Sequence, residues 1–517
     1  MSSLFLKKDL ARVVREATDP ALAEGHGLKR SLSALNLTTL GIGAIIGAGI
    51  FSLTGRAAAE YAGPGVALSF VIGGILCTLA GLCYAELAAM IPVAGSAYAY
   101  TYATMGELVA WIIGWDLALE YAFGAITVTG AWSGYMYSLL HKTFGIQFAD
   151  TLLRFTKGPG EFVTLADGLS ARGYCNVPAM FLALCCTAVL YRGVKESAWV
   201  NNIIVIIKII IVLSFIVLGW SVISPANLHV NPDATGLAAL VPEVVVNSKG
   251  EHHFGWGTGG VLTGAGVVFF SYIGFDAVST AAQEAKNPQR DMPIGILASL
   301  IICTILYILV STVLTGVVNY TELGVPDPIA VGIDAIVRLR GWSPSAQLWF
   351  TAAVKIGAIA GLSSVVLVLM LGQARIFYAM AKDGLLPWFG ATHPKNHTPH
   401  ISTLLTGAMV AILGGFLPYH LVGELVSIGT LLAFVLVCVG VPILRVTNPD
   451  QPRPFRAPLP WVTGPLGAVA CLWVMSSLPG DTWLRLVVWL AIGFVIYFTY
   501  GKKHSRVQRE RLESHIP

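Results

Sequence analysis

Apolar residues gather into long runs along this chain, separated by short polar segments. We distinguish twelve runs of about 20 residues, the length that an α-helix needs to cross a hydrocarbon core about 30 Å thick. A membrane β-barrel would instead show short segments in which apolar and polar residues alternate. The pattern therefore predicts an all-α polytopic membrane protein, with spans at 33–60, 65–90, 98–129, 178–194, 198–221, 260–284, 294–319, 346–373, 401–417, 421–446, 461–478 and 483–500.

Composition agrees with this prediction. Hydrophobic residues make up 55% of the chain and charged residues 12%, whereas a soluble domain has about 25% charged residues. This excludes a disordered chain and argues against a soluble enzyme. The net charge of +4 comes without a basic domain, so we expect the lipid bilayer and no nucleic acid as a partner. The eight cysteines have no metal-binding spacing, and we interpret them as apolar filler.

Basic residues predict the orientation of the chain in the membrane. Twelve spans put both termini on one side. With the N-terminus inside, 21 Lys and Arg residues lie on the inner side and 9 on the outer side, while Lys208 and Lys355 fall within spans. Because basic residues concentrate in cytoplasmic segments, we predict cytosolic N- and C-termini and a multi-pass protein of the cytoplasmic (plasma) membrane. Between spans, an apolar stretch near Ile329–Val337 predicts a helix lying over one face.

The first span contains a cluster of glycines. Four fall within nine positions, at Gly41, Gly43, Gly47 and Gly49, and each weakens a helix by about 1 kcal/mol relative to alanine. One interpretation is close packing between helices, because small residues four apart allow backbones to approach. The other is an interruption of the helix that exposes backbone groups.

The sixth span contains a second interruption, at Phe269–Asp276, where serine, tyrosine and glycine break an apolar run. Paired interruptions in corresponding spans of two five-helix halves indicate a binding site near the middle of the membrane. An unwound turn frees N–H groups on one side and carbonyl groups on the other. We therefore expect a zwitterionic ligand, its carboxylate on the amides of Gly47–Gly49 and its ammonium on carbonyls near Ile45, Phe270 and Ile273.

Several motifs make the sequence similar to a known family. They are the glycine-rich first span, Tyr84–Leu87 followed by Pro92 and Gly95, the segment Glu284–Pro293, and the segment Gln373–Pro387. Together they resemble the amino acid–polyamine–organocation superfamily, and most closely the bacterial branch of the cationic amino acid transporter family.

This resemblance covers about residues 28–458. It implies a five-plus-five inverted repeat of the leucine-transporter type, with helices 1 and 6 broken and two further helices added. It also implies secondary transport of amino acids by alternating access, often coupled to protons. On this basis we divide the chain into a cytosolic N-terminal arm (1–31), a ten-helix transport core (32–447), two additional transmembrane helices (448–501) and a basic cytosolic tail (502–517).

Lys208 lies about ten residues into its span, hence about 15 Å along the helix. A charge at such a depth costs roughly 3 kcal/mol, so we expect its ammonium to face a cavity or a carboxylate. Burial disfavours the charged form and a carboxylate favours it, and this conflict suits a proton switch. The alternative is an ion pair that never titrates.

The resemblance adds a role for Lys208. Proton-coupled members of the superfamily carry a fifth-helix lysine where sodium-coupled relatives bind Na⁺, and Lys208 matches that position. Its ammonium would tie the first helix to the eighth. We therefore expect a proton gradient and no other cofactor or metal. Sodium is disfavoured, although the hydroxyls of Ser363 and Ser364 remain available to it.

Acidic residues also fall within spans. Glu120 and Asp276 resemble positions that close relatives link to the substrate pocket and the coupling lysine, so we predict proton-coupling roles for both. A purely structural hydrogen-bonding role is the alternative. Asp116 lies four residues before Glu120 on the same helix face. Lys355 lies nearer the outer end of its span, and we expect it to snorkel or pair locally.

Further residues complete the predicted substrate site. Phe270 matches an aromatic ring that covers the substrate in the family, and Leu362 is expected to approach the ligand side chain and to favour a small neutral amino acid over a cationic one. The full set of predicted substrate-binding residues is Ile45, Ile46, Gly47, Ala48, Gly49, Phe270, Ser271, Ile273 and Leu362.

Alternatives to proton-coupled transport remain open. The chain could exchange amino acids without net proton movement, or bind them as a sensor or subunit without transport. An enzyme is not expected, because the histidine doublet His252–His253 has no matching acidic ligand set. A homo-oligomer or a small membrane subunit is compatible with the sequence, which names neither the amino acid nor the proton stoichiometry.

Overall fold

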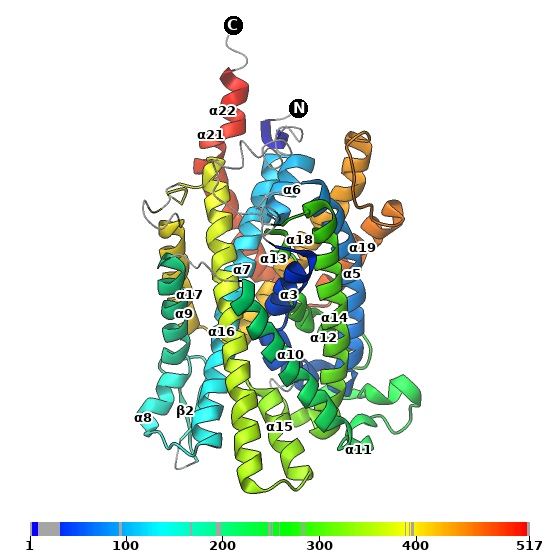
Figure 1. Cartoon of the computed structure of the whole chain (residues 1–517), viewed down its shortest axis with the longest axis vertical. Helices are drawn as coiled ribbons and strands as arrows, with labels where there is room; N and C mark the ends of the chain where they lie inside the picture. Colours follow the sequence, from blue (N-terminus) through cyan, green and yellow to red (C-terminus); the bar gives the residue numbers. More distant parts are fainter. Residues whose placement is uncertain are drawn as a thin grey trace.

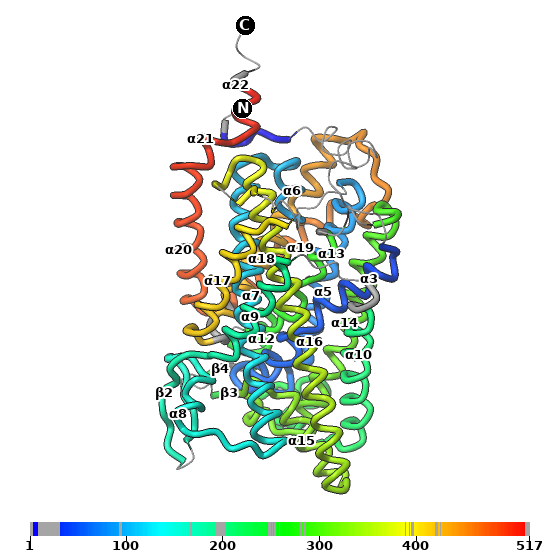
Figure 2. The backbone as a smooth tube through the Cα atoms, turned by 60° about the vertical axis from the view of Figure 1, so that its left-hand side comes forward, coloured from blue at the N-terminus to red at the C-terminus, as the bar shows by residue number. Residues whose placement is uncertain are grey.

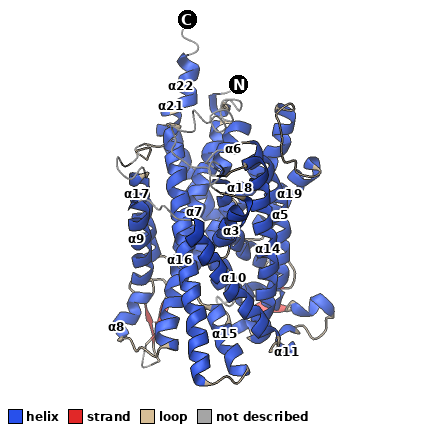
Figure 3. Cartoon of the chain, in the orientation of Figure 1, coloured by secondary structure: helices blue, strands red, loops and turns tan. Residues whose placement is uncertain are grey.

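The computed structural model is built almost wholly of helices (Figure 3). It describes residues 3–8, 32–91, 96–165, 168–192, 198–246, 250, 252–257, 259–280, 282, 285–387, 389–391, 393 and 398–513. The α-helices are α3 (Ala34–Ile45), α4 (Thr54–Ala57), α5 (Val66–Met90), α6 (Ser96–Thr104), α7 (Glu107–Tyr137), α8 (Asp150–Leu153), α9 (Val177–Arg192), α10 (Ala198–Trp220), α11 (Pro225–Leu228), α12 (Val261–Val268), α13 (Ala277–Thr280), α14 (Pro288–Val317), α15 (Pro328–Leu339), α16 (Pro344–Lys382), α17 (His400–Phe416), α18 (Tyr419–Thr447), α19 (Pro460–Ser476), α20 (Gly480–Ile496), α21 (Lys502–His504) and α22 (Arg506–Glu513).

Short helical segments of other types connect or extend these helices. They are η1 (Ser3–Phe5), η3 (Gly49–Leu53), η4 (Ala58–Ala62), η5 (Gly63–Gly65), η6 (Ser138–Thr143), η7 (Arg154–Thr156), η8 (Gly236–Leu240), η9 (Phe269–Tyr272), η11 (Tyr320–Glu322) and η12 (Tyr497–Gly501). Two antiparallel pairs are the strands that the structure describes: β1 (Phe162–Thr164) with β2 (Ser170–Arg172), and β3 (Val244–Val246) with β4 (His252–Phe254).

The helices follow the apolar runs of the sequence, because each predicted run overlaps helical residues. Within the described residues, eight helical stretches are long and apolar enough to cross a membrane, and the first, Ala34–Met90, contains the first two predicted runs. Three shorter apolar helices, α9, α17 and α19, have 16, 17 and 17 residues. The chain is therefore a helical membrane protein with several spans.

Most helices run along the long axis of the molecule (Figures 1 and 2). Helix α14 packs against both α3 and α5, and α7 packs against both α16 and α18. The two termini lie at one end, and α15 with the two strand pairs lies at the other (Figure 1). Helix α15 covers the stretch predicted near Ile329–Val337 and buries Ile329, Ile333 and Ile336.

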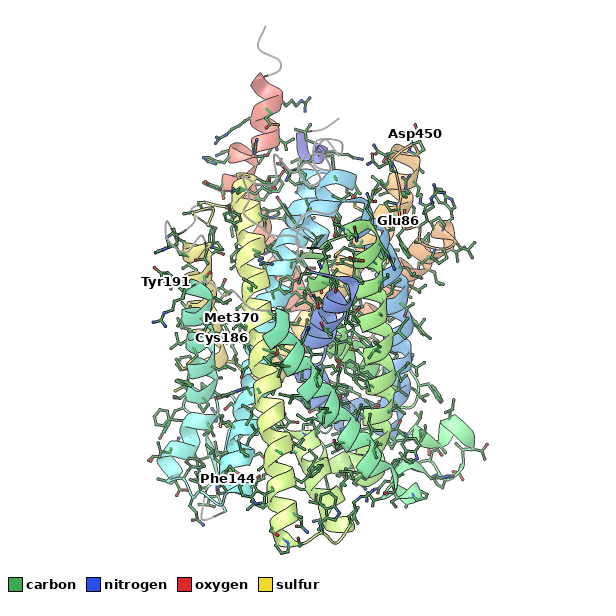
Figure 4. The ribbon with its side chains drawn as sticks, in the orientation of Figure 1. Glu86, Phe144, Cys186, Tyr191, Met370 and Asp450 are labelled. Atoms are coloured by element: carbon green, nitrogen blue, oxygen red, sulfur yellow. The ribbon has the colours of Figure 1, made fainter. Side chains whose placement is uncertain are left out.

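Glu86 belongs to one of the sequence motifs and lies toward the end that carries the termini, whereas Phe144 lies near the opposite end (Figure 4). The carboxylate of Glu86 is buried and accepts two hydrogen bonds from Arg445 of α18, at 2.9 and 2.8 Å. It also accepts one from the N–H of Ala457, at 2.7 Å. This bidentate pair joins α5, α18 and the connection before α19.

Glu107, at the start of α7, forms hydrogen bonds with both the N-terminal segment and the C-terminal tail. Its buried carboxylate accepts hydrogen bonds from the hydroxyls of Tyr102 and Tyr497, at 2.9 and 2.8 Å, and from the amide of Gln508, at 2.6 Å. The hydroxyl of Ser505 also donates to it. Its own N–H donates to the carbonyl of Leu6, at 3.0 Å, so the N-terminal segment and the tail meet on one helix start.

We predict that Glu107→Ala destabilises the protein. The substitution leaves several buried donors without an acceptor, which costs about 1–3 kcal/mol for an unsatisfied buried group. The melting temperature of the purified protein in detergent measures the effect. Glu243→Ala removes an exposed carboxylate and serves as the control. Equal melting temperatures of the two variants would contradict the role given to Glu107.

Candidate functional site

The first span loses regular helical structure in its glycine-rich stretch. Helix α3 ends at Ile45, and Ile46 turns away with φ −72° and ψ 92°. Helical structure resumes at Gly49, in the continuous segment formed by η3, α4 and η4. The N–H of Ile46 still bonds to the carbonyl of Ile42, at 2.9 Å, but the N–H groups of residues 47–50 have no acceptor among the described residues. Such a turn offers donors to an anionic group.

The sixth span changes direction at the corresponding place. Helix α12 passes into η9, after which Ile273 has a ψ of 132° and Gly274 has a φ of +118°. The two stretches touch. A Cβ atom on Gly274 would lie 2.9 Å from the carbonyl carbon of Ala44, and one on Gly49 would lie 2.2 Å from the Cα of Ser271. Only glycine permits this approach of one backbone to the other.

Tyr307 of α14 joins the two stretches. Its hydroxyl lies 2.7 Å from the carbonyl oxygen of Ile45 and 2.9 Å from that of Ser271, so one O–H is shared between the two chain segments. Tyr307 is buried. Sequence analysis missed it, because a tyrosine in an apolar span carries no signal of the carbonyls it will meet. The hydroxyl of Ser271 itself has no partner among the described residues.

A small cavity lies between the two stretches. Its volume of about 10 Å³ is close to the space of one water molecule. Among the predicted substrate-binding residues, six line it, and Ile46, Ser271 and Leu362 do not. The lining is entirely apolar apart from backbone groups and consists of Ala44, Ile45, Gly47, Ala48, Gly49, Val128, Phe270, Ile273, Val365 and Leu369.

The predicted contact of Leu362 with the ligand side chain stays a prediction, because Leu362 does not line this cavity. Leu362 is buried on α16, yet Val365 and Leu369 of the same helix reach the cavity. Val128 of α7 was also missed. A single apolar helix without polar landmarks does not indicate which of its turns faces a neighbouring interruption.

Two of the three carbonyl groups expected to hold an ammonium, those of Ile45 and Phe270, have protein donors. The carbonyl of Ile45 accepts from Tyr307, and that of Phe270 accepts from the N–H of Ile273, at 3.2 Å. A carbonyl oxygen has two lone pairs, so each keeps one further acceptor position. A ligand ammonium would therefore share these oxygens with the protein.

Lys208 of α10 binds the end of α3. Its ammonium donates to the carbonyl oxygens of Gly43 and Ile46, at 2.7 and 3.1 Å, and its side chain is fully buried. The carboxylate partner considered in the sequence analysis is not among its described contacts. Carbonyls at a helix C-terminus carry partial negative charge and take its place. Helix α16 closes the other side, because a Cβ atom on Gly361 would lie 2.9 Å from the Cε of Lys208.

The two serines considered for sodium donate to backbone carbonyls. Ser363 donates to the carbonyl of residue 359, at 2.9 Å, and accepts from the indole of Trp132, also at 2.9 Å. Ser364 donates to the carbonyl of residue 361, at 2.8 Å.

The predicted carboxylates form a cluster apart from Lys208. Asp276 accepts from the hydroxyl of Tyr121, at 2.6 Å, and from the N–H of Gly274, at 3.2 Å. Glu120 lies within electrostatic range of Asp276 and Asp116. One oxygen of Glu120 and both oxygens of Asp116 have no hydrogen-bond partner among the described residues. Asp276 thus fixes the backbone turn at Gly274, while the carboxylate of Asp116 and one oxygen of Glu120 are buried without a hydrogen-bond partner among the described residues.

Other candidates fall outside this region. The ammonium of Lys355 lies 3.4 Å from a carboxylate oxygen of Asp334 and 3.1 Å from the hydroxyl of Thr143, which is the local pairing that we predicted. The doublet His252–His253 lies in β4. No group of three or more His, Cys, Asp or Glu residues suited to a metal ion occurs in the described part of the chain.

Apolar helices with two touching interruptions around a small cavity form an arrangement typical of membrane transporters. Comparison with known proteins agrees. Residues 32–504 match the family described as amino acid permease. The chain belongs to this family, within the amino acid–polyamine–organocation superfamily. The similar proteins are permeases and transporters, which confirms the prediction that the chain is not an enzyme.

Individual relatives differ in the substrate that their names carry. The chain is 41% identical to the methylthioribose transporter of Bacillus subtilis (strain 168), over 98% of this chain and 100% of that protein. It is 42% identical to the branched-chain amino acid permease BcaP of the same organism, over 98% and 99%. It is 37% identical to the vacuolar cationic amino acid transporter 4 of Arabidopsis thaliana, over 82% and 65%.

We predict that Tyr307→Phe impairs the site specifically. It removes the hydroxyl that joins the two interruptions and leaves two buried carbonyls with one donor fewer, a loss of about 1–3 kcal/mol. Ligand binding to the purified protein, measured by thermal stabilisation, should weaken about tenfold or more, since 1.4 kcal/mol is a factor of ten.

Tyr272→Phe is the matched control. It removes a hydroxyl that donates to the carbonyl of Phe70, at 2.7 Å, and that does not line the cavity. Both variants should lose stability, but only Tyr307→Phe should lose affinity. Equal effects on affinity would mean that the hydroxyl of Tyr307 has no particular role in the site.

Proposed function

We propose that the protein is a secondary active transporter of neutral L-amino acids with apolar side chains, working by alternating access and coupled to protons. The observation that carries this proposal is the apolar cavity between the two touching interruptions, with unpaired N–H groups of residues 47–50 beside it. The proposal includes twelve spans arranged as a five-plus-five inverted repeat with two added helices, and both termini in the cytosol.

The lining supports a neutral substrate. A substrate carboxylate would accept from the N–H groups of residues 47–50, where the partial positive charge of a helix N-terminus is available. Its side chain would lie against Val128, Val365, Leu369 and Phe270. No acidic side chain lines the cavity to pair with an arginine or lysine substrate. The name of the branched-chain permease relative agrees with this class of substrate.

A second candidate substrate is a neutral sugar with an apolar substituent. The relative named methylthioribose transporter aligns over its whole length with 98% of this chain. Unpaired backbone N–H groups can also bind sugar hydroxyls, and apolar walls can bind a methylthio group. Counter-flow with labelled leucine, arginine and methylthioribose distinguishes the candidates. We expect leucine to exchange. Exchange of arginine or of methylthioribose without exchange of leucine would refute our assignment.

The closed cavity supports a change of conformation during transport. A volume of about 10 Å³ does not admit an amino acid, so the interrupted helices must separate from α7 and α16 to bind one. The side chains that would move apart are Phe270 and Ile273 on one side and Val365 and Leu369 on the other, because all four line the cavity. Opening toward one side and then the other is alternating access.

Lys208 supports the proton coupling. Its ammonium holds the carbonyls of Gly43 and Ile46, directly before the unpaired N–H groups. Loss of its proton removes the positive charge that stabilises these carbonyls and loosens the end of α3. An ammonium in this place occupies the carbonyl oxygens that a sodium ion would need. The buried cluster of Asp276, Glu120 and Asp116 supplies further groups able to carry a proton.

We predict that Lys208→Met strongly reduces uptake driven by a pH gradient. The variant keeps an unbranched side chain of nearly the same length but loses two charge-assisted hydrogen bonds to α3, each worth about 1.5–3 kcal/mol. Uptake into liposomes with an imposed pH difference should fall about tenfold or more. Counter-flow exchange without a gradient should fall less.

Lys355→Met is the matched control, because it removes another buried ammonium that lies away from the cavity. It should keep the response to the gradient. Unchanged gradient-driven uptake in Lys208→Met would remove the coupling claim and leave an exchanger. Ligand binding without any flux in the unaltered protein would instead indicate a sensor or subunit.

We also predict a shift of substrate size in Val365→Ala. The change enlarges the cavity beside Gly47, because Val365 lies close to this glycine. A Cβ atom on Gly47 would lie 3.1 Å from a methyl group of Val365. Competition assays should show larger apolar amino acids gaining on valine by about fourfold, since each CH₂ buried contributes about 0.8 kcal/mol. Leu362→Ala is the control, because Leu362 lies outside the cavity lining. A matching shift in the control would mean that the substrate does not contact Val365.

A further inference from the structure

A second cleft, distinct from the cavity between the interruptions, lies at the end of the molecule that carries the termini. Its volume is about 380 Å³, within the range of ligand pockets, which begins at about 300 Å³. One wall is the connection that follows α16. The other wall comes from the end of the last span and from α22. The lining residues are Ala381, Gly384, Leu386, Pro387, Gly390, Ala391, Tyr500, His504 and Arg509.

Backbone contacts hold the two walls of this cleft together. The N–H of Arg506 donates to the carbonyl of Asp383, at 3.0 Å. Gly384 has a φ of +81°, and a Cβ atom there would lie 2.2 Å from the carbonyl oxygen of His504. The carboxylate of Asp383 is occupied by Lys8, at 2.6 Å, and by the hydroxyl of Tyr98, at 2.6 Å. The carboxylate nearest the cleft in sequence is therefore neutralised.

The chemistry of the cleft is cationic and aromatic. The rings of Tyr500 and His504 stack with centroids 4.1 Å apart, and Nδ1 of His504 lies 3.0 Å from the carbonyl oxygen of Tyr500. The guanidinium of Arg509 has no partner among the described residues, whereas neighbouring Arg506 is paired with Glu510, at 3.0 Å. Among the described residues, no acidic side chain lines the cleft. An arginine fork beside an imidazole suits a phosphate group.

The position of the cleft adds a second argument. Tyr500 and His504 lie at the end of the last apolar stretch, Gly480–His504, and the segment 502–511 at and beyond this end contains five basic residues. Clusters of four to eight basic residues just cytoplasmic of a span are typical of binding to anionic lipid headgroups. In the proposed orientation, the cleft opens where headgroups of the inner leaflet lie.

We propose that this cleft binds a phosphate group, supplied by the headgroup of an anionic lipid or by a soluble phosphate compound, through Arg509 and His504. Binding there stabilises the tail in its contact with the end of α16. The inference rests on the proposed cytosolic orientation of the termini but not on transport.

The test measures binding to the full-length protein purified in detergent at low salt. The probes are dioctanoyl-phosphatidylglycerol, dioctanoyl-phosphatidylcholine and inorganic phosphate, and the readout is thermal stabilisation with titration. We expect the phosphatidylglycerol to bind and the phosphatidylcholine not to bind. Competition by inorganic phosphate would identify a free phosphate group as sufficient, and its failure to compete would identify the lipid headgroup as the source.

Two variants locate the binding. Arg509→Gln should weaken binding about fivefold, the contribution of one basic residue near an anionic surface. Arg506→Gln removes an exposed arginine of the same helix that does not line the cleft, and it should bind as the unaltered protein does. Arg509 is also exposed, so its substitution leaves the packing of the fold intact.

Three results would overturn the proposal. The first is that neither the phosphatidylglycerol nor inorganic phosphate binds. The second is equal binding of the two lipids. The third is an equal loss of binding in Arg506→Gln and Arg509→Gln. The last would mean diffuse attraction to the basic tail. Because binding is measured without flux, failure of the transport function leaves this test valid, and failure here leaves the transport function untouched.

Discussion

A backbone hydrogen-bonding group inside a membrane has no water to satisfy it, and this constraint governs the centre of the molecule. A regular helix satisfies its own groups, so each interruption needs donors or acceptors from elsewhere. Tyr307 and Lys208 supply donors to the carbonyls at the end of α3, at 2.7 Å to Ile45 and to Gly43. The N–H groups of residues 47–50 remain without acceptors among the described residues. The described residues thus satisfy the carbonyl side of the interruption, and the amide side is where we propose that a substrate carboxylate binds.

This asymmetry connects the ligand to the rest of the molecule. Tyr307 belongs to α14 and Lys208 to α10, so two helices outside the cavity hold the same end of α3. A ligand that accepts hydrogen bonds from the N–H groups beyond Ile46 would bind next to carbonyls that already accept hydrogen bonds from these two side chains. Gly49 and Gly274 let the two interruptions touch. In the proposed mechanism, substrate binding at the cavity and the proton on Lys208 thus act on one short stretch of backbone.

The sequence predicted the positions of the helices and of their interruptions because these depend on the local pattern of apolar residues and glycines. Twelve apolar runs located the helices, and glycines within two of them indicated the stretches around Gly47 and Gly274. The individual partners were not predictable, because contacts between distant helices depend on their rotation and register. Lys208 was expected to need a carboxylate or a cavity, but helix-end carbonyls took that place. Tyr307 and Val365 look like ordinary residues of apolar spans, and only their neighbours reveal what they do.

The two ends of the chain impose a second constraint that acts on the helices of the cavity. Glu107 begins α7, whose Val128 lines the cavity, and it binds both the N-terminal segment and the tail. Asp383 follows α16, whose Val365 and Leu369 line the same cavity, and it binds Lys8. Residues 3–8 therefore contact the start of α7 and the residue after α16, the two helices whose side chains form one wall of the cavity. Under the proposed alternating access, separation of α7 or α16 from the interrupted helices requires these contacts to rearrange as well, which connects the N-terminal segment and the tail to the proposed substrate site.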